Sequence, residues 1–165
     1  MNRLQAEAHQ LFAQLGLETV FPDYGPPQLI GSARSGLIVL RDLDVMFDAP
    51  TATLSGVLAG LGAVAERCDL LSADVRDERG DRRPTPRLTD ERFYAVLGVG
   101  EWKVDLTFWL HVIERPHVAD ALRLQRITEE ERQAILRLKR TCPGYPELIG
   151  GTDVYDAVLR HGVRA

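Results

Sequence analysis

Apolar residues recur at helical spacing near the start of the chain. Ala8, Leu11 and Leu15 repeat every three or four residues along one face, which predicts an amphipathic helix, and Gly16 is placed to end it. The stretch Pro50–Arg67 has the same spacing over a longer span, so a second amphipathic helix is expected there. Its three glycines each cost about 1 kcal/mol relative to alanine in a helix, and close packing on a sheet would compensate for them.

Short apolar runs between these helices and after them predict β-strands. The last two runs flank Gly98–Glu101, which is a turn signal, so these two strands are expected to form a hairpin. The expected strands cover residues 28–30, 43–47, 69–75, 93–98 and 102–110.

The last third of the chain returns to helical patterns. Thr128 and Glu131 have the spacing of a capping box in front of a helix that ends near Cys142. A last short helix carries Val154 and ends at Gly162. The order of elements predicts an α/β or α+β fold: one mixed sheet flanked by helices, with a short helical C-terminus.

Length and composition indicate one folded unit. The 165 residues are enough for a single domain, 1–165, with a core at about 17–110 and a helical segment at about 116–165. Hydrophobic residues make up 45% and charged residues 27%, as in ordinary globular proteins. The N-terminus lacks the apolar core of a signal peptide, and no apolar run is long enough for a bilayer, so we expect a cytoplasmic protein without a membrane partner. Cys68 and Cys142 are far apart and are expected to be reduced.

Charge gives little reason to expect nucleic acid as a partner. The net charge is −4, and between residues 74 and 92 six arginines face six acids, so this segment is locally neutral and is expected to be a solvated, mobile loop. His111 and His117 flank Glu114, but Pro116 interrupts the segment and no cysteine is near. We therefore expect a solvent-exposed loop there rather than a zinc site.

Three aspartates carry the candidate chemistry. Asp42 and Asp44 alternate along a predicted strand, so their carboxylates point to the same face, where they would repel one another without a cation. Asp105 is the only acid inside the later apolar strand. If the two strands are neighbours, three carboxylates converge as ligands for Mg²⁺, with Mn²⁺ as a substitute.

Gly31 and Ser32 lie where a short apolar strand would end and a helical turn begin. Free backbone N–H groups at such a turn suit a phosphate, and glycine allows the backbone to approach closely. A phosphate site beside a carboxylate-held metal is the minimum that phosphoryl or nucleotidyl transfer requires.

The string Gly31-Ser32, nine residues, and Asp42-Leu43-Asp44-Val45, followed by Lys103-Val104-Asp105-Leu106-Thr107, resembles the signature of the DNA polymerase beta-type nucleotidyltransferases. The resemblance covers about residues 29–110. It implies a nucleotidyltransferase fold in which Gly31 and Ser32 contact a triphosphate, Asp42 and Asp44 hold two metals, and Asp105 is a third ligand that helps to deprotonate the attacking hydroxyl.

Three basic residues are further candidates for nucleotide binding. Arg34 lies in the expected phosphate loop. Arg41 stands where many of the resembling proteins carry a small polar residue, and it either meets phosphate oxygens or points to solvent. Lys103 shares a strand face with Asp105, and it either reaches phosphate or pairs with an acid.

The resemblance predicts an enzyme that transfers a nucleoside monophosphate from a nucleoside triphosphate to an acceptor hydroxyl with Mg²⁺ on the three aspartates. We expect a small-molecule acceptor and a cleft whose second wall comes from residues 116–165, completed in one alternative by a homodimer. The other alternative is a regulatory, antitoxin-like module that binds the triphosphate without turnover.

Overall fold

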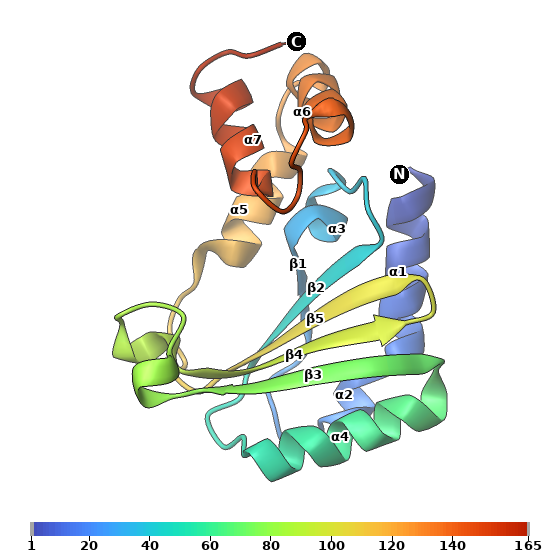
Figure 1. The fold of residues 1–165 in the computed structure, drawn as a ribbon, viewed down its shortest axis with the longest axis vertical. Helices are drawn as coiled ribbons and strands as arrows, with labels where there is room; N and C mark the ends of the chain where they lie inside the picture. Colours follow the sequence, from blue (N-terminus) through green and yellow to red (C-terminus); the bar gives the residue numbers. More distant parts are fainter. Residues whose placement is uncertain (1, 165) are drawn as a thin grey trace.

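The computed structural model describes residues 2–164, which fold around one five-stranded mixed sheet (Figure 1). The strand order is β1-β2-β5-β4-β3, and only the central pair β2–β5 is parallel. This matches the predicted fold class, a mixed sheet flanked by helices. The strands are β1 (Gln28–Ile30), β2 (Asp42–Asp48), β3 (Leu70–Glu78), β4 (Arg92–Val99) and β5 (Trp102–Trp109).

The helices include the predicted ones and add others. The capping box at Thr128 is present, with both of its hydrogen bonds formed. The segment after Arg115, expected to be a loop, is instead a helix, which was missed because Pro116 was interpreted as a break. Pro116 occupies the first turn of this helix, where the N–H that proline lacks would have no partner in any case. The helices are α1 (Arg3–Leu15), α2 (Leu17–Val20), α3 (Gly31–Ser35), α4 (Leu54–Arg67), α5 (Pro116–Gln125), α6 (Glu129–Thr141) and α7 (Gly151–Leu159).

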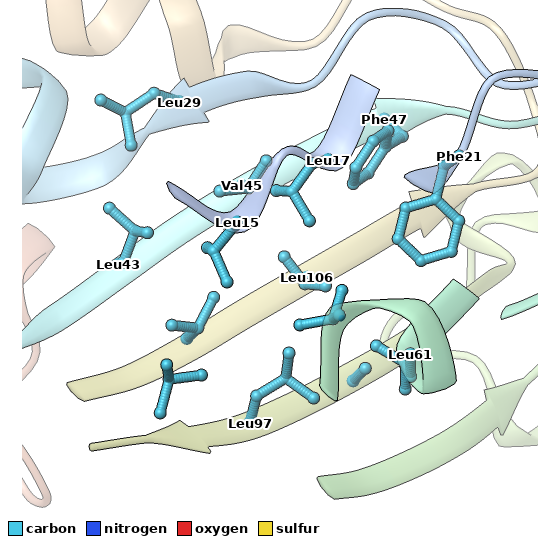
Figure 2. Close-up of a cluster of buried hydrophobic side chains, with 14 of the residues drawn as sticks. Leu15, Leu17, Phe21, Leu29, Leu43, Val45, Phe47, Leu61, Leu97 and Leu106 are labelled. Carbon is cyan, nitrogen blue, oxygen red and sulfur yellow. The ribbon is translucent and has the colours of Figure 1, made fainter. Parts of the chain in front are cut away.

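The main core lies between one face of the sheet and the helices α1, α2 and α4 (Figure 2). Alternate residues of β2 and β5 point into it, and Phe47 and Phe108 stack there with ring centroids 4.9 Å apart. The glycines of α4 allow the close packing that the sequence suggested, because the Phe21 ring fills the space that a side chain on Gly60 would need. Side-chain alternation on these strands places Asp42, Asp44 and Asp105 on the opposite face of the sheet.

A second, smaller core joins the C-terminal helices to the rest of the molecule. Ile135 of α6 and Val154 and Val158 of α7 pack with Leu37, which follows α3. The C-terminal segment therefore rests against the loop between α3 and β2, and Figure 1 shows its helices beyond one end of the sheet.

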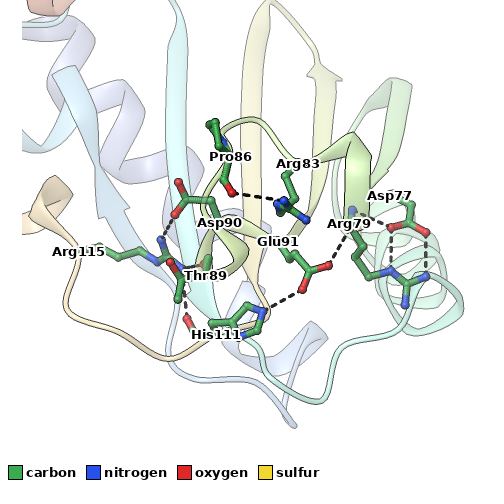
Figure 3. A network of polar contacts seen from close by, with 10 residues as sticks. Asp77, Arg79, Arg83, Pro86, Thr89, Asp90, Glu91, His111 and Arg115 are labelled. Carbon is green, nitrogen blue, oxygen red and sulfur yellow. Dashed lines mark hydrogen bonds and ion pairs between the residues drawn. The ribbon is translucent and has the colours of Figure 1, made fainter.

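The charged segment expected to be a loop is partly regular structure. Strand β3 continues to Glu78, because its ladder with β4 extends to the pair Glu78–Arg92, and two short 3-10 turns follow at Gly80–Arg82 and Leu88–Asp90. Ion pairs then hold the segment, among them Arg79 to Asp77 at 2.8 Å and Arg115 to Asp90 at 3.2 Å (Figure 3). Four of the six arginines pair with acids of the same segment, namely Arg76, Arg79, Arg82 and Arg92.

Of the two histidines near this segment, His111 lies in the expected loop and only His117 differs from expectation. His111 lies 3.0 Å from Glu91 (Figure 3), and His117 belongs to helix α5, with its ring 6.1 Å from that of Trp109. Neither belongs to the one cluster of potential metal ligands found among the described residues. Within residues 2–164 no helix combines the length and apolar character needed to cross a membrane.

Candidate functional site

Three carboxylates converge on the polar face of the sheet. Parallel pairing of β2 and β5 places Asp44 directly beside Asp105, and Asp42 beside Lys103. One oxygen from each of Asp42, Asp44 and Asp105 lies within 4.8 Å of the others. Side-chain alternation along β2 puts Asp42 and Asp44 on one face of the sheet, and the register between β2 and β5 brings Asp105 beside them.

Two of these carboxylates, those of Asp42 and Asp44, are destabilised as anions. Burial, followed by the charges of Asp42 and Asp105, raises the pKa of Asp44 to about 7. Burial also raises the pKa of Asp42, against the opposing effect of Lys103. Such shifts occur where acids are withdrawn from water beside like charges, and a bound cation would relieve them.

Lys103 and Tyr94 both bind the same oxygen of Asp105. The Lys103 ammonium and the Tyr94 hydroxyl each donate to Asp105 Oδ2 at 2.8 Å, and Lys103 also reaches Asp42 Oδ1 at 3.4 Å. Partial burial lowers the pKa of Lys103, but its contacts with the two acids outweigh this and leave it raised. Of the two alternatives for Lys103, pairing with an acid is the one present in this structure.

The second oxygen of Asp105 fits a metal ligand. Asp105 Oδ1 is buried and has no hydrogen-bond partner among the described residues, although a buried carboxylate oxygen normally has one. Hard divalent cations prefer carboxylate oxygens as ligands, and this oxygen is unpaired inside a cluster of three acids. The residues present therefore fit Mg²⁺ or Mn²⁺, and Asp42, Asp44 and Asp105 are the side chains that would hold it.

Gly31 and Ser32 lie directly beside the aspartates. Strand β1 ends at Ile30, which pairs with Asp44, and Gly31 then turns the chain into α3 with φ +65°. This left-handed conformation favours glycine, and a side chain there would also meet the Asp44 carboxylate. The turn therefore places the first N–H groups of α3 next to the acidic cluster.

A cleft of about 700 Å³ opens in front of these residues. Gly31, Ser32, Asp42 and Asp44 form one wall, and the opposite wall comes from the C-terminal segment, as the sequence predicted. The residues of that second wall are Lys139, Tyr145, Pro146, Glu147, Gly150, Gly151, Thr152 and Tyr155.

Lys139 is the cleft residue that sequence reasoning missed. It is only 4% exposed, and its ammonium donates to the Tyr155 hydroxyl at 2.8 Å and to the Leu37 carbonyl at 3.0 Å. Burial lowers its pKa to about 8, although Asp44 and Asp42 oppose the shift. The sequence could have indicated it, because Lys139 lies four residues after Ile135 and therefore on the apolar face of α6.

The two arginines proposed for nucleotide binding are placed differently. Arg41 lines the cleft, but its guanidinium pairs with Glu7 at 3.3 Å and approaches Glu101 at 3.7 Å, and neither acid lines the cleft. Arg34 does not line the cleft, and its backbone carbonyl accepts a hydrogen bond from Gln125.

Solved structures share this architecture. A cytoplasmic RNA terminal U-transferase superposes with a TM-score of 0.58 at 16% identity, over 96% of this chain and 46% of its own. The Cid1 poly(U) polymerase with MgGTP bound gives 0.59 at 16% identity over 84% of this chain and 42% of its own. The chain has the fold of the polymerase beta-like nucleotidyltransferases. Terminal uridylyl transferase 4 from Trypanosoma brucei gives 0.51 at 18% identity, over 95% of this chain and 54% of its own.

The nucleotidyltransferase fold is supported by structure and not by sequence similarity. No family model and no curated protein sequence matches the chain. The chain spans about half the length of the structural neighbours or less. These neighbours are nucleotidyltransferases, and the chain has a triad of aspartates that could bind metal.

Proposed function

We propose that this protein is a metal-dependent nucleotidyltransferase that moves a nucleoside monophosphate from a nucleoside triphosphate to an acceptor hydroxyl. The convergence of the Asp42, Asp44 and Asp105 carboxylates beside the cleft carries this proposal. A divalent cation bound there would neutralise charge on the phosphates and on the three acids.

The cleft offers groups suited to a triphosphate. Ser32 and the N–H groups after Gly31 lie on one side, and the buried Lys139 ammonium lies on the other. A lysine held by Tyr155 and a backbone carbonyl is already oriented, so little side-chain entropy is lost on binding. Arg41 at the edge of the cleft could add a further contact, whereas Arg34 lies outside it.

The proposed transfer forms one bond at the α-phosphorus and breaks another. The acceptor oxygen forms a bond to the α-phosphorus, the bond from that phosphorus to the bridging oxygen of the β-phosphate breaks, and pyrophosphate leaves with the electron pair. The proton of the acceptor hydroxyl passes to the Asp105 carboxylate. Positioning and charge neutralisation supply most of the rate in reactions of this kind.

The proposal also concerns the chemical class of the acceptor. A small molecule is compatible with the net charge of −4, which gives no general attraction to nucleic acid. The names of two structural neighbours, an RNA terminal U-transferase and a poly(U) polymerase, point instead to RNA for those proteins. Both kinds of acceptor therefore belong in the test.

The test is pyrophosphate release from each of the four ribonucleoside triphosphates, with and without Mg²⁺, in the presence of short RNA or small hydroxylated compounds. We expect release that requires metal and that Asp42→Asn reduces by about a hundredfold or more. Asp74→Asn, an exposed acid of β3 on the same sheet face, is the matched control and should retain activity. Tight triphosphate binding with no turnover for any acceptor would favour the regulatory alternative.

A further inference from the structure

Strand β3 forms one edge of the sheet, and its outer side is unpaired in residues 2–164. The Leu110 N–H donates to the Glu91 carbonyl, so the odd-numbered residues of β4 turn their backbone polar groups toward β5. The even-numbered residues of β4 therefore face β3, where their partners are also even-numbered. The backbone groups that point outward from β3 consequently belong to its odd-numbered residues, Ala73, Val75 and Asp77.

Both ends of this edge are protected. At one end the Arg82 side chain donates to the Asp77 carbonyl at 2.8 Å, and at the other end the register with β4 shifts near the start of β3. Irregular register and basic side chains are common means of protecting an exposed strand edge from further pairing. Between these two ends, the outward groups of Ala73 and Val75 have no hydrogen-bond partner in the described part of the chain.

The charges along the open part of this edge are complementary to themselves. Asp74 and Arg76 lie on the polar face of the sheet, on either side of Val75, and both side chains are more than half exposed. A second copy related by a two-fold axis at Val75 would place Asp74 of each copy opposite Arg76 of the other. An axis at Asp74 or at Arg76 would instead place like charges opposite one another, which is destabilising. The charges therefore favour one register.

Helix α4 lies beside this edge and has an apolar outer surface (Figure 1). The sequence has no charged residue between positions 54 and 65, although Leu54 is 36% exposed and Leu58 is 50% exposed. A helix that is apolar on all sides is normally buried on all sides. Exposed apolar surface that extends over several turns is typical of a protein interface.

The two exposed leucines lie close to the same axis. Helix α4 and strand β3 run in opposite directions from the short connection between Arg67 and Leu70. The five steps from Leu70 to Val75 span about 16 Å of strand. The same distance along α4, counted back from Arg67, is about 11 residues and ends between Leu54 and Leu58. A two-fold axis at Val75 therefore brings the exposed leucines of two copies together.

We propose that this protein forms a homodimer in which β3 pairs antiparallel with β3 of a second copy about Val75, and α4 packs on α4. The two sheets then continue into one. The interface is closed by its symmetry, because both copies use the same surface and the protected ends exclude further strands. The cleft lies beside the C-terminal helices, at the other end of the molecule from α4, so this dimer does not complete it and the inference is independent of the proposed function.

Analytical ultracentrifugation of the full chain, without metal or nucleotide, tests this inference. The unsubstituted protein should be a dimer that dissociates on dilution. Asp74→Arg puts like charges opposite Arg76, and Arg76→Asp puts like charges opposite Asp74, so each variant alone should dimerise at least about tenfold more weakly.

An equimolar mixture of these two variants should form a heterodimer, because every charge pair across the interface is then opposite. The mixture separates pairing between chains from the Asp74–Arg76 pair within one chain, at 2.7 Å, which neither variant retains. Circular dichroism shows whether each variant is folded.

A second pair of variants tests the helix. Leu58→Lys should also weaken the dimer at least about tenfold, because it places a charge in the apolar contact. Leu148→Lys is the matched control, since Leu148 is 86% exposed in the C-terminal segment, and it should leave the dimer unchanged.

Two results would overturn the inference. One is a monomer at every concentration of the unsubstituted protein. The other is a dimer that remains intact in folded Asp74→Arg and Leu58→Lys, because another surface would then hold it. Two monomeric variants that fail to pair when mixed would overturn the register at Val75. None of these measurements depends on metal binding or transfer, so they leave the proposed function to its own test.

Discussion

A side chain on Gly31 would collide with the Asp44 carboxylate, because Gly31 turns the chain at φ +65° with Asp44 directly beside it. The turn that we propose to face the phosphates is therefore packed against the acid that we propose to hold the metal.

Gly31→Ala should therefore damage both stability and binding. The left-handed conformation alone costs alanine about 1–2 kcal/mol, and displacement of Asp44 adds to this. We expect a lower free energy of unfolding and at least about tenfold weaker metal-dependent triphosphate binding, measured by denaturant unfolding and calorimetry. Gly62→Ala is the matched control, because a Cβ at this helical position meets nothing within 4 Å, and it should stabilise the protein by about 0.5–1 kcal/mol.

Asp44 should make the metal-free protein less stable as the pH rises. Its pKa is about 7 in the folded protein and near 3.8 when unperturbed, so the folded state holds this proton more tightly. The stability from this carboxyl is fully present below about pH 4 and is lost as the pH rises to 7. Asp44→Asn should remove that slope and stabilise the metal-free protein at pH 8 by roughly 1–3 kcal/mol.

Urea unfolding across pH 4–8 measures this effect. Saturating Mg²⁺ should flatten the slope in the unsubstituted protein and have little effect on Asp44→Asn. Asp77 has the opposite sign but contributes its change below this range, because its hydrogen bond from Arg79 lowers its pKa from 3.8 to about 2. A metal-free slope that persists in Asp44→Asn would contradict the assignment.

Lys103 should compete with the metal for the carboxylates. Its ammonium lies 2.8 Å from Asp105 and 3.4 Å from Asp42, where it neutralises the cluster. Lys103→Met should destabilise the metal-free protein and increase the affinity for Mn²⁺ without nucleotide by a few-fold, because a competing cation has been removed. Arg41→Met is the control, since Arg41 pairs with Glu7 and Glu101, and its Mn²⁺ affinity should stay near that of the unsubstituted protein.

Calorimetric titration with Mn²⁺ checks this prediction. Equal Mn²⁺ affinities for the unsubstituted protein and Lys103→Met would mean that the ammonium leaves the cluster at no cost, and that the contact seen here has no part in metal binding.

Lys139 should give triphosphate binding a pH dependence in the alkaline range. Its pKa of about 8 means that the ammonium is largely charged at pH 7 and largely neutral at pH 9. Triphosphate affinity should therefore fall between pH 7 and 9, and Lys139→Met should bind at least about tenfold more weakly at pH 7 with no further loss at pH 9. Tyr155→Phe keeps the cation and serves as the control, with a smaller loss of affinity.

Calorimetry in buffers of different ionisation enthalpy measures the number of protons taken up on triphosphate binding. Binding at pH 8 should take up protons, because the phosphates favour the charged amine. The absence of proton uptake, together with full affinity in Lys139→Met, would exclude Lys139 from the triphosphate site.

The sequence by itself determined the local features of this protein. Alternation on β2 placed Asp42 and Asp44 on one face, and the isolation of Asp105 in an apolar strand marked it as the third acid. Helical spacing defined α1 and α4, and the capping box defined the start of α6. These features follow from periods of two and 3.6 residues, which act over a few neighbours and can be followed along the chain.

Only the tertiary structure decided which distant side chains meet. The register of β2 with β5 brought Asp105 to Asp44, and the packing of α6 against Leu37 brought Lys139 into the cleft. Arg34 lies outside the cleft, and α5, which the sequence did not predict, places the His117 ring 6.1 Å from that of Trp109. Contacts of this kind depend on how whole helices and strands bury their apolar faces against one another. The local periodicity of the sequence does not indicate which helices and strands will pack together.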